Sequence, residues 1–196
     1  TFIMPRIDVE WALGDRTTLH LRNQPRLGST SLDDLYATNP YAQHAPSLRP
    51  PLETTNAEVG LTWSRGSIRL TTGVGYRYAP TYRYFELGGQ AAYTDGLYQV
   101  QYESARIFQG RAEAALQGVD GVQASLGLAV RDGALSRADT SDVDIPNFAT
   151  LTADAMVGVS FAGGDGLVTA ETRLKGPRYA STAQTTRLNP YFTLDL

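Results

Sequence analysis

The chain of 196 residues contains no cysteine. This absence excludes disulfide bonds, a thiol nucleophile and thiolate metal ligands. No run of about 18 apolar residues is present, which excludes a transmembrane helix. Only 19% of the residues are charged, the formal net charge is −3 and no basic block occurs, so composition gives no reason to propose a nucleic-acid partner. Because the chain starts at Thr1 without a signal peptide, we expect a processed or truncated polypeptide.

What the sequence does contain is an alternation of apolar and polar residues with a period of two. Odd positions from Ala149 to Phe161 are apolar, whereas even positions from Thr150 to Ser160 are mostly polar or small. Successive side chains of a β-strand point to opposite faces, so such a segment has one apolar and one polar wall. The pattern recurs in about ten segments, and none of the clearest ones has a charged residue on its apolar side. The sequence therefore predicts an all-β protein whose sheet has two unlike faces.

Turn signals divide this pattern into hairpins, because glycine supplies the positive φ that short turns need. The turns are expected at Gly14-Asp15, Arg65-Gly66, Asp95-Gly96, Asp120-Gly121 and Gly163–Gly166. Between them we expect eleven antiparallel strands, at 4–13, 16–24, 55–64, 68–78, 84–93, 97–104, 109–117, 121–131, 148–162, 165–176 and 187–196.

The connections between these strands alternate in length. Long polar connections are expected at 25–53, 132–147 and 177–187, and shorter ones at 79–83 and 105–108. Alternation along the chain gathers the tight turns at one end of the sheet and the longer loops at the other. That layout is typical of outer-membrane barrels, which have short periplasmic turns and longer outer loops.

The placement of aromatic residues on the apolar side of the strands favours a sheet whose apolar face meets lipid. Trp11, Trp63 and Phe161 come a few residues before a short turn, and Tyr98 follows one, so these four are predicted to lie at one membrane interface. A second group clusters towards the opposite ends of the strands, at Tyr76, Tyr78, Phe85, Phe108 and Phe148. Two aromatic bands flanking an aliphatic zone are what a membrane-spanning barrel requires.

The number of strands bears on the completeness of the barrel. Bacterial single-chain barrels close with an even number of strands, and an open edge in lipid leaves backbone groups unsatisfied at several kcal/mol each. Eleven strands do not meet this condition. We therefore expect residues 1–196 to form a single partial domain, a contiguous piece of a larger barrel.

Several sequence motifs resemble those of TonB-dependent outer-membrane receptors. Asn39-Pro40-Tyr41, the loop Pro46–Pro51 and the strand start Asn56-Ala57-Glu58-Val59-Gly60-Leu61 are similar to the family's loop and its N-x-E-x-G-L strand, although Arg49 and Pro51 replace the usual Lys and Glu. Three later segments resemble consecutive late strands of the family in order and spacing: Ile145-Pro146-Asn147, Gly176–Tyr179 and Asn189–Leu196.

This resemblance implies the C-terminal part of a barrel of about 22 strands, without the plug, the early strands and the last two strands. It implies a role in energised uptake of a scarce solute across the bacterial outer membrane. The partners it implies are outer-membrane lipid, the remainder of the barrel and plug of the same parent protein, and TonB through the plug region. The transported solute and any lipoprotein partner are not indicated.

The best ligand candidates lie in the long outer loop 25–53, because connections of this length are usually functional. They are Tyr36, Tyr41, His44 and Arg49. Charged residues on the polar side of the strands are expected to face the lumen, as a wall held by cross-strand pairs more than as a ligand path. The main ones are Arg69, Arg77, Glu103, Arg111, Glu113, Asp154, Glu171 and Arg173.

Catalytic and metal sites are not indicated. His20 and His44 have no neighbouring ligand at metal spacing, and there is no G-x-S-x-G nucleophile motif. Asp139, Asp142 and Asp144 offer hard oxygen ligands but lack the glycine and terminal glutamate of a calcium loop, so a solvated acidic loop is preferred. The sequence therefore predicts no enzyme, no cofactor and no metal.

Three other interpretations stay open. A porin, secretion or assembly barrel shares the same wall and differs by lacking a plug. A soluble β-sandwich binding module would pack its apolar face on a second sheet and would not place its aromatic residues at common levels. A lipid-modifying barrel enzyme would need a catalytic dyad at one rim.

Overall fold

The computed structural model describes residues 4–42, 48–87, 98–119, 121–136, 142–161 and 166–195. Its main feature is one antiparallel sheet in which each strand pairs with the next, which confirms the predicted all-β meander. The nine strands along the sheet are β1 (Ile7–Gly14), β2 (Thr17–Asn23), β5 (Thr55–Arg65), β6 (Ile68–Leu87), β7 (Tyr98–Val119), β8 (Val122–Ser136), β10 (Leu151–Phe161), β11 (Gly166–Lys175) and β14 (Tyr191–Asp195).

Shorter elements lie in the connections. β3 (Arg26–Leu27) pairs with β4 (Leu52–Glu53), β9 (Val143–Asp144) pairs with β8, and β12 (Arg178–Tyr179) pairs with β13 (Arg187–Leu188). The helix α1 (Leu32–Thr38) begins at Ser31, whose hydroxyl accepts a hydrogen bond from the Asp34 backbone amide. In the part of the chain that the structure describes, no helix has the length and hydropathy that crossing a membrane requires.

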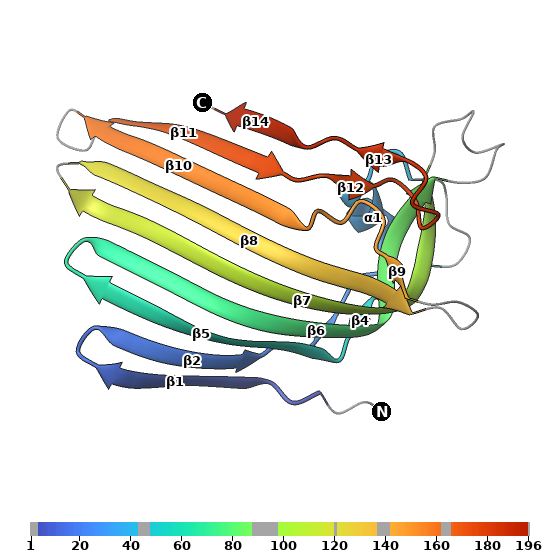
Figure 1. Ribbon diagram of the computed structural model, residues 1–196, viewed down its shortest axis with the longest axis horizontal. Helices are drawn as coiled ribbons and strands as arrows, with labels where there is room; N and C mark the ends of the chain where they lie inside the picture. Colours follow the sequence, from blue (N-terminus) through green and yellow to red (C-terminus); the bar gives the residue numbers. More distant parts are fainter. Residues whose placement is uncertain are drawn as a thin grey trace.

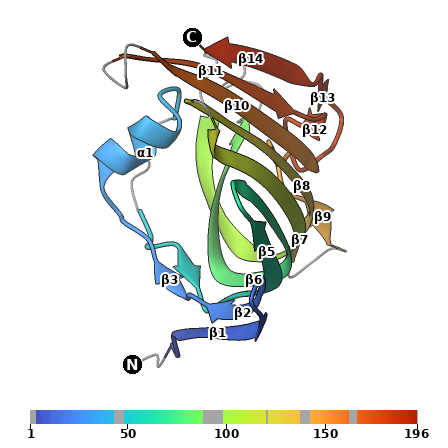
Figure 2. The ribbon, with the colours of Figure 1, turned by 90° about the vertical axis from the view of Figure 1, so that its left-hand side faces the viewer.

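The sheet is bent into an arc, with α1 over its open side (Figures 1 and 2). Tight hairpins join β1 to β2, β5 to β6, β7 to β8 and β10 to β11 at one end, called here the turn end. Gly66 and Gly121 adopt positive φ values of 57° and 77° in two of these hairpins, as the turn chemistry requires. The longer connections gather at the opposite end, called the loop end, so the predicted alternation is confirmed.

The structure corrects the prediction in its middle part, where the expected strands 68–78 and 84–93 are one strand, β6, and 97–104 and 109–117 are one strand, β7. The predicted connections at 79–83 and 105–108 are therefore wrong. Their place is taken by an irregularity in the β6–β7 pairing between Ala79 and Tyr82. Pro80 lies in it, and a bulge accommodates a residue that has no backbone amide to donate. The predicted turn Asp95-Gly96 lies outside the described residues.

Two further corrections follow from the lengths of the strands. β8 continues to Ser136, so the loop predicted at 132–147 begins with strand residues, and Val143–Asp144 then add β9 to the same sheet. The expected total of eleven strands becomes nine along the sheet, because four of the predicted strands merge into two. The predicted outer loop 25–53 does connect β2 to β5, and it contains β3, α1 and β4.

A small hydrophobic core lies at the loop end of the sheet. It consists of Tyr84, Ala105, Ile107, Leu135 and Ile145, all buried. Ile145 comes from the connection after β9 and packs over β8, where it and Phe148 approach Gly133 so closely that a Cβ there would lie 2.9 Å from Ile145 Cδ1. This core ties the β8–β10 connection to the sheet.

Candidate functional site

The apolar face of the sheet is exposed along its whole width. Trp11 on β1 is 67% exposed, Leu126 on β8 is 59% exposed and Val157 on β10 is 48% exposed. Strand register places these side chains on one face with the apolar residues of the other strands, for example through the pairs Trp11↔Leu19 and Ala155↔Leu126. No second layer covers this face in the ranges that the structure describes. A continuous exposed apolar surface of this extent indicates contact with lipid or with another protein.

Aromatic side chains bound this apolar face at two levels. Trp11, Trp63 and Phe161 lie near the turn end, as predicted. Tyr76 and Phe108 lie towards the loop end, paired across β6 and β7 with their ring centroids 4.8 Å apart. The structure therefore places aromatic rings at both limits of the aliphatic zone.

Tyr98 does not lie where the sequence predicted it. It pairs with Leu87 at the loop end, and its amide donates a hydrogen bond to the Tyr41 carbonyl oxygen. The prediction at the turn end was wrong because it depended on a tight turn at Asp95-Gly96, whereas β6 and β7 are joined at the loop end.

The height of the apolar zone matches a membrane. On β6 the zone extends from Ile68 to Tyr78, ten steps along the strand. At about 3.3 Å per residue this is about 33 Å. A strand tilt of about 40° reduces it to about 25 Å, which is the height of the lipid-facing band of outer-membrane barrels.

Beyond the aromatic residues at the loop end, the two faces of the sheet exchange polarity. Register places Arg106 and Asp132 on the same face as Phe108, where the wall turns charged. On the opposite face the same strand segments carry Ile107 and Leu135, which belong to the buried core. The lipid-like surface therefore ends at a defined level.

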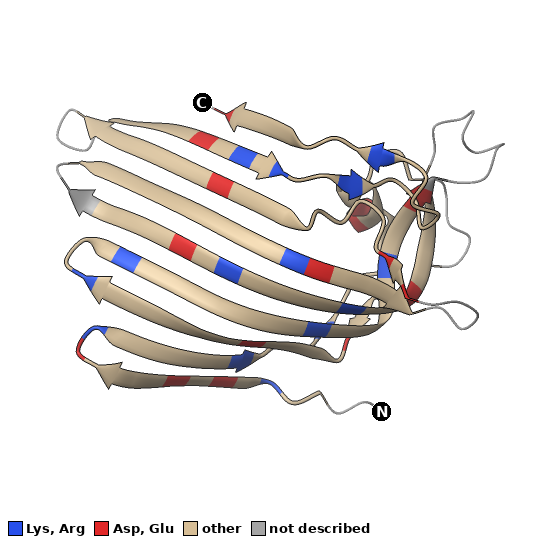
Figure 3. Ribbon diagram, in the orientation of Figure 1, with Lys and Arg blue, Asp and Glu red and all other residues tan. Residues whose placement is uncertain are grey.

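The polar face is the concave one. β3 lies within the open side of the arc, and its partner β4 brings Glu53 to Arg77 at 3.4 Å. Charged residues are distributed along the strands of the main sheet (Figure 3). Register places all eight of the predicted lumen-facing residues on this face: Arg69, Arg77, Glu103, Arg111, Glu113, Asp154, Glu171 and Arg173.

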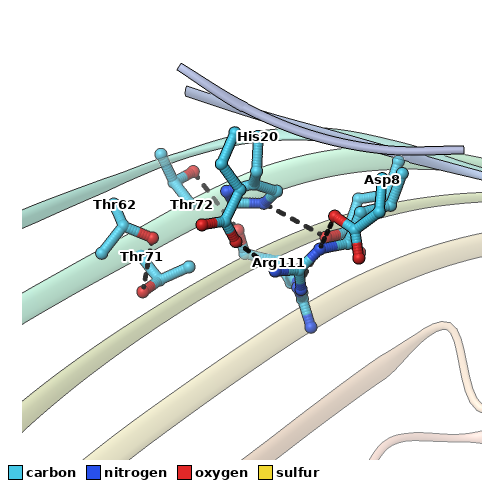
Figure 4. Close-up of polar contacts among 9 residues, drawn as sticks. Asp8, His20, Thr62, Thr71, Thr72 and Arg111 are labelled. Atoms are coloured by element: carbon cyan, nitrogen blue, oxygen red, sulfur yellow. Dashed lines mark hydrogen bonds and ion pairs between the residues drawn. The ribbon is translucent and has the colours of Figure 1, made fainter. Parts of the chain in front are cut away.

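Among the described residues of this face, His20, Glu58 and Arg111 from three different strands form a polar cluster around a nearly buried histidine (Figure 4). Arg111 Nη2 donates a hydrogen bond to Glu58 Oε1 over 2.6 Å. His20 is only 5% exposed, and its Nε2 lies 3.4 Å from the same carboxylate oxygen without hydrogen-bond geometry. The Glu58 carboxylate, whose side chain is 14% exposed, thus lies between the His20 imidazole and the Arg111 guanidinium.

Glycine makes room for this cluster. His20 pairs with Gly60, and a Cβ on Gly60 would lie 2.5 Å from the Thr72 carbonyl oxygen and against the imidazole. The same relation recurs elsewhere on the polar face, where long polar side chains lie across glycines: Gln109 over Gly75, Asp154 over Gly127 and Gln123 over Gly158. These glycines therefore let long polar side chains lie across the neighbouring strand.

Two further groups of ion pairs on this face are more exposed. Arg22 bridges two carboxylates of β1, with Nε 3.3 Å from Asp8 and Nη2 2.9 Å from Glu10. Arg173 lies 3.4 Å from Glu171. These contacts support the interpretation of the inward charges as a wall of cross-strand pairs.

The burial of the carboxylate partner predicts different contributions from Arg111 and Arg22. Replacing Arg111 with methionine should lower the free energy of unfolding by about 1 to 3 kcal/mol, because Glu58 is nearly buried and loses its charged donor. Replacing Arg22 in the same way should cost less than about 1 kcal/mol, because its partners Asp8 and Glu10 are 47% and 62% exposed. Urea unfolding of both variants in detergent micelles measures the difference, and equal losses would contradict the assignment.

The predicted ligand candidates lie in the connection between β2 and β5. Tyr36 is exposed on α1, Tyr41 is 64% exposed and Arg49 is exposed, whereas His44 lies outside the described residues. Leu35, on the other side of α1, is completely buried and anchors the helix. The structure thus presents two tyrosines and an arginine at the surface of one anchored loop.

The structure assigns a role to one acidic residue of the 132–147 segment. Asp142 accepts a short hydrogen bond from Arg106 and a second one, of 3.2 Å, from the Ser136 hydroxyl. Asp139 lies outside the described residues. Over the residues that are described, no three His, Asp or Glu side chains are arranged to hold a metal ion.

Comparison with solved structures identifies the fold. BauA, the ferric preacinetobactin receptor from Acinetobacter baumannii, superposes with a TM-score of 0.62 over 97% of this chain at 12% identity. FpvA, the pyoverdine outer-membrane receptor from Pseudomonas aeruginosa PAO1, gives 0.59 over 97% at 13% identity, and the copper transporter OprC gives 0.57 over 94% at 15% identity. The fold is that of the TonB-dependent receptor barrel.

The chain corresponds to a part of such a barrel. It spans 28% of the length of BauA, 28% of FpvA and 29% of OprC. No protein-family model and no curated protein matches the sequence. The similarity therefore lies in the path of the backbone. At these sequence identities it establishes the fold alone.

Proposed function

We propose that these residues form part of the barrel wall of a TonB-dependent receptor in the outer membrane of a Gram-negative bacterium, and that the whole protein takes up a scarce solute. The observation that carries the proposal is the sheet itself. Its exposed apolar face has a height of about 25 Å along β6 and carries aromatic residues towards both ends, and its concave face is polar.

The topology supports a larger closed barrel. Consecutive strands alternate in direction, so β1 and β14, the first and ninth along the sheet, run the same way. An antiparallel pair cannot form between them, and lipid does not tolerate an open sheet edge. An odd number of further antiparallel strands between β14 and β1 satisfies both edges and gives the even total of bacterial barrels.

The transport role extends this proposal from the resemblance and from the neighbours. BauA is described as a ferric preacinetobactin receptor, FpvA as a pyoverdine receptor and OprC as a copper transporter. In our proposal the polar wall surrounds a plug that belongs to the same parent protein, and TonB acts through that plug. The proposed protein is a receptor and transporter and carries out no catalysis.

The soluble sandwich is the weaker interpretation. It requires a second sheet on the apolar face, and no described residue covers that face. A porin or secretion barrel shares the wall, whereas the receptor and transporter structures described above match 94–97% of this chain.

Uptake in living cells tests the proposal. The full-length gene is deleted, and growth on a panel of iron, copper and vitamin sources is compared in tonB-positive and tonB-negative cells. We expect the deletion to abolish growth on one limiting source, with no further effect once TonB is absent. Uptake that continues at the same rate without TonB would show a passive channel.

The loop tyrosines are proposed as solute contacts. Replacing Tyr36 and Tyr41 with alanine should lower solute affinity about ten-fold or more, since exposed aromatic anchors commonly contribute 1 to 3 kcal/mol to binding. Barrel assembly should stay unchanged because both side chains point to solvent. Gln184, exposed in a different loop, provides the control as Gln184→Ala. Equal affinity of all three variants would remove these residues from the site.

A further inference from the structure

A furrow runs along β7 on the apolar face of the sheet. Its floor consists of the small residues Ala112 and Ala114, and register places Ala114 between Leu70 of β6 and Leu126 of β8. Trp63 lines the same hollow from β5, and its volume is about 600 Å³. Two walls of large apolar side chains and a low floor give this part of the face the shape that receives a hydrocarbon chain.

The furrow lies in the half of the apolar zone that is nearest to the turn end. Trp63 pairs with Leu70, and the next pair on this face, Arg65 with Ile68, is the last one before the β5–β6 hairpin. Two residues separate these levels, which is about 7 Å along the strand. Tight turns of outer-membrane barrels lie on the periplasmic side. The lipids that reach this furrow therefore belong to the periplasmic leaflet, where the head groups carry phosphate.

Two arginines come together at this end of the furrow. The Ser64 amide donates a hydrogen bond of 2.9 Å to the Arg16 carbonyl oxygen, so the β1–β2 turn places Arg16 beside the end of β5, where Arg65 follows Ser64. Both arginines are exposed, and neither side chain has a hydrogen bond or ion pair to a described residue. Asp15 is their exposed acidic neighbour, which leaves one net positive charge. A guanidinium is a strong ligand for phosphate.

We propose that this face holds one anionic phospholipid of the periplasmic leaflet. An acyl chain lies in the furrow over Ala112 and Ala114, and the phosphate contacts Arg16 and Arg65. The inference rests on the proposed function, because it requires the apolar face to meet a bilayer with the turn end on the periplasmic side. It goes beyond that function by assigning a lipid class to named residues.

Shape and charge make different contributions to this site. Lipid tails are as apolar as leucine, so the furrow gains no hydrophobic advantage over the surrounding bilayer and retains a chain by close packing between its walls. The head group is selected by charge. A zwitterionic lipid would bring an ammonium group to two guanidiniums, whereas phosphatidylglycerol brings a phosphate and two hydroxyl groups without a positive charge.

Native mass spectrometry of the full-length barrel tests this site. The protein is released from detergent after equilibration with equal amounts of phosphatidylglycerol and phosphatidylethanolamine that carry the same acyl chains. We expect the phosphatidylglycerol adduct to exceed the phosphatidylethanolamine adduct about five-fold. Equal retention of both lipids, or a preference for phosphatidylethanolamine, would overturn the proposal.

Head-group variants locate the phosphate contact. The double variant Arg16→Gln/Arg65→Gln should remove the preference between the two lipids. Arg106→Gln removes the same charge at the loop end of the same face, and it should leave the preference unchanged. A preference that survives the double variant, or that is lost equally in Arg106→Gln, would overturn the assignment of the phosphate to the turn end.

A second pair of variants tests the furrow. Ala112→Leu raises the floor and should lower retention of both lipids about five-fold. Ala170→Leu adds the same side chain on the same face of β11, outside the furrow, and should leave retention unchanged. Equal retention by the two variants would show that no chain lies over Ala112.

Insertion into bilayers separates this inference from the proposed function. A full-length barrel that inserts into vesicles but retains both lipids equally overturns the lipid site and leaves the receptor proposal standing. A full-length protein that does not insert into bilayers overturns both.

Discussion

Replacing Val157 with arginine should cost about 2 to 4 kcal/mol and prevent assembly of the full-length barrel, because the side chain lies in the middle of the lipid-facing zone. Val157 pairs with Ala124 on one side and Ala170 on the other, and it is 48% exposed on the apolar face. Since no described side chain of opposite charge lies on this part of the face, the guanidinium would meet hydrocarbon. The fraction of folded barrel, resolved by its heat-dependent shift on gel electrophoresis, measures the effect.

The matched control is the neighbouring residue on the opposite face. Met156 lies on the polar side, opposite Ser125 and Glu171. Met156→Arg introduces the same charge one position away, where water and a carboxylate receive it, and we expect a change of less than about 1 kcal/mol. A loss of equal size in both variants would contradict the assignment of the two faces.

Replacing Gly60 with valine should have the second large effect, a loss of about 3 kcal/mol or more in the free energy of unfolding. A Cβ at this position would lie 2.5 Å from the Thr72 carbonyl oxygen and against the His20 imidazole. The imidazole cannot move away easily, because it is 5% exposed beside Glu58. The carbonyl belongs to the neighbouring strand, so relief requires separation of β5 from β6. Urea unfolding in micelles measures the loss.

Gly110 provides the control for this substitution. It lies in the middle of β7, and a Cβ there would have nothing within 4 Å. Gly110→Ala should therefore change stability by no more than about 0.5 kcal/mol. If Gly60→Val were as well tolerated as Gly110→Ala, the close approach of the three strands around His20 would be incorrect.

The alternating strands could be predicted from the sequence because one physical signal determines them. In β10 every second residue from Leu151 to Phe161 is apolar, and the structure places these residues on one face throughout. The same holds for β1, where Trp11 and Val9 share a face opposite Glu10. Tight turns at Gly66 and Gly121 were equally clear, since both residues need a positive φ.

The long strands β6 and β7 could not be predicted in the same way, because their pattern changes along their length. Pro80 lies in a bulge, and the polarity of the two faces exchanges between Phe108 and Ile107 as the wall passes from the apolar zone to the loop-end core. The alternation of apolar and polar residues is therefore interrupted at that level. From the sequence alone, such an interruption indicates the end of a strand.

The polar wall was predicted by its charges, whereas the enclosed cluster was not. The sequence neighbours of His20 give no reason to pair it with Glu58 or Arg111, which are 38 and 91 positions further along the chain. Only the register of β2, β5, β6 and β7 brings the three side chains together. The signal in the sequence was Gly60, because a glycine inside a strand pattern often marks a close approach of another group, and His20 lies against it in the structure.

The most direct test of the central claim measures which face of β10 meets lipid. The chain has no cysteine, so single cysteines can be introduced one at a time from Leu151 to Phe161 in the full-length barrel, spin-labelled and reconstituted into vesicles. Accessibility to oxygen, which concentrates in the bilayer, is then compared with accessibility to a water-soluble nickel complex. We predict high oxygen accessibility at Ala153, Ala155 and Val157 and low values at the even positions between them, with a period of two. Low accessibility to both reagents at the three odd positions would show a dry protein core on that face and would contradict a lipid-facing wall.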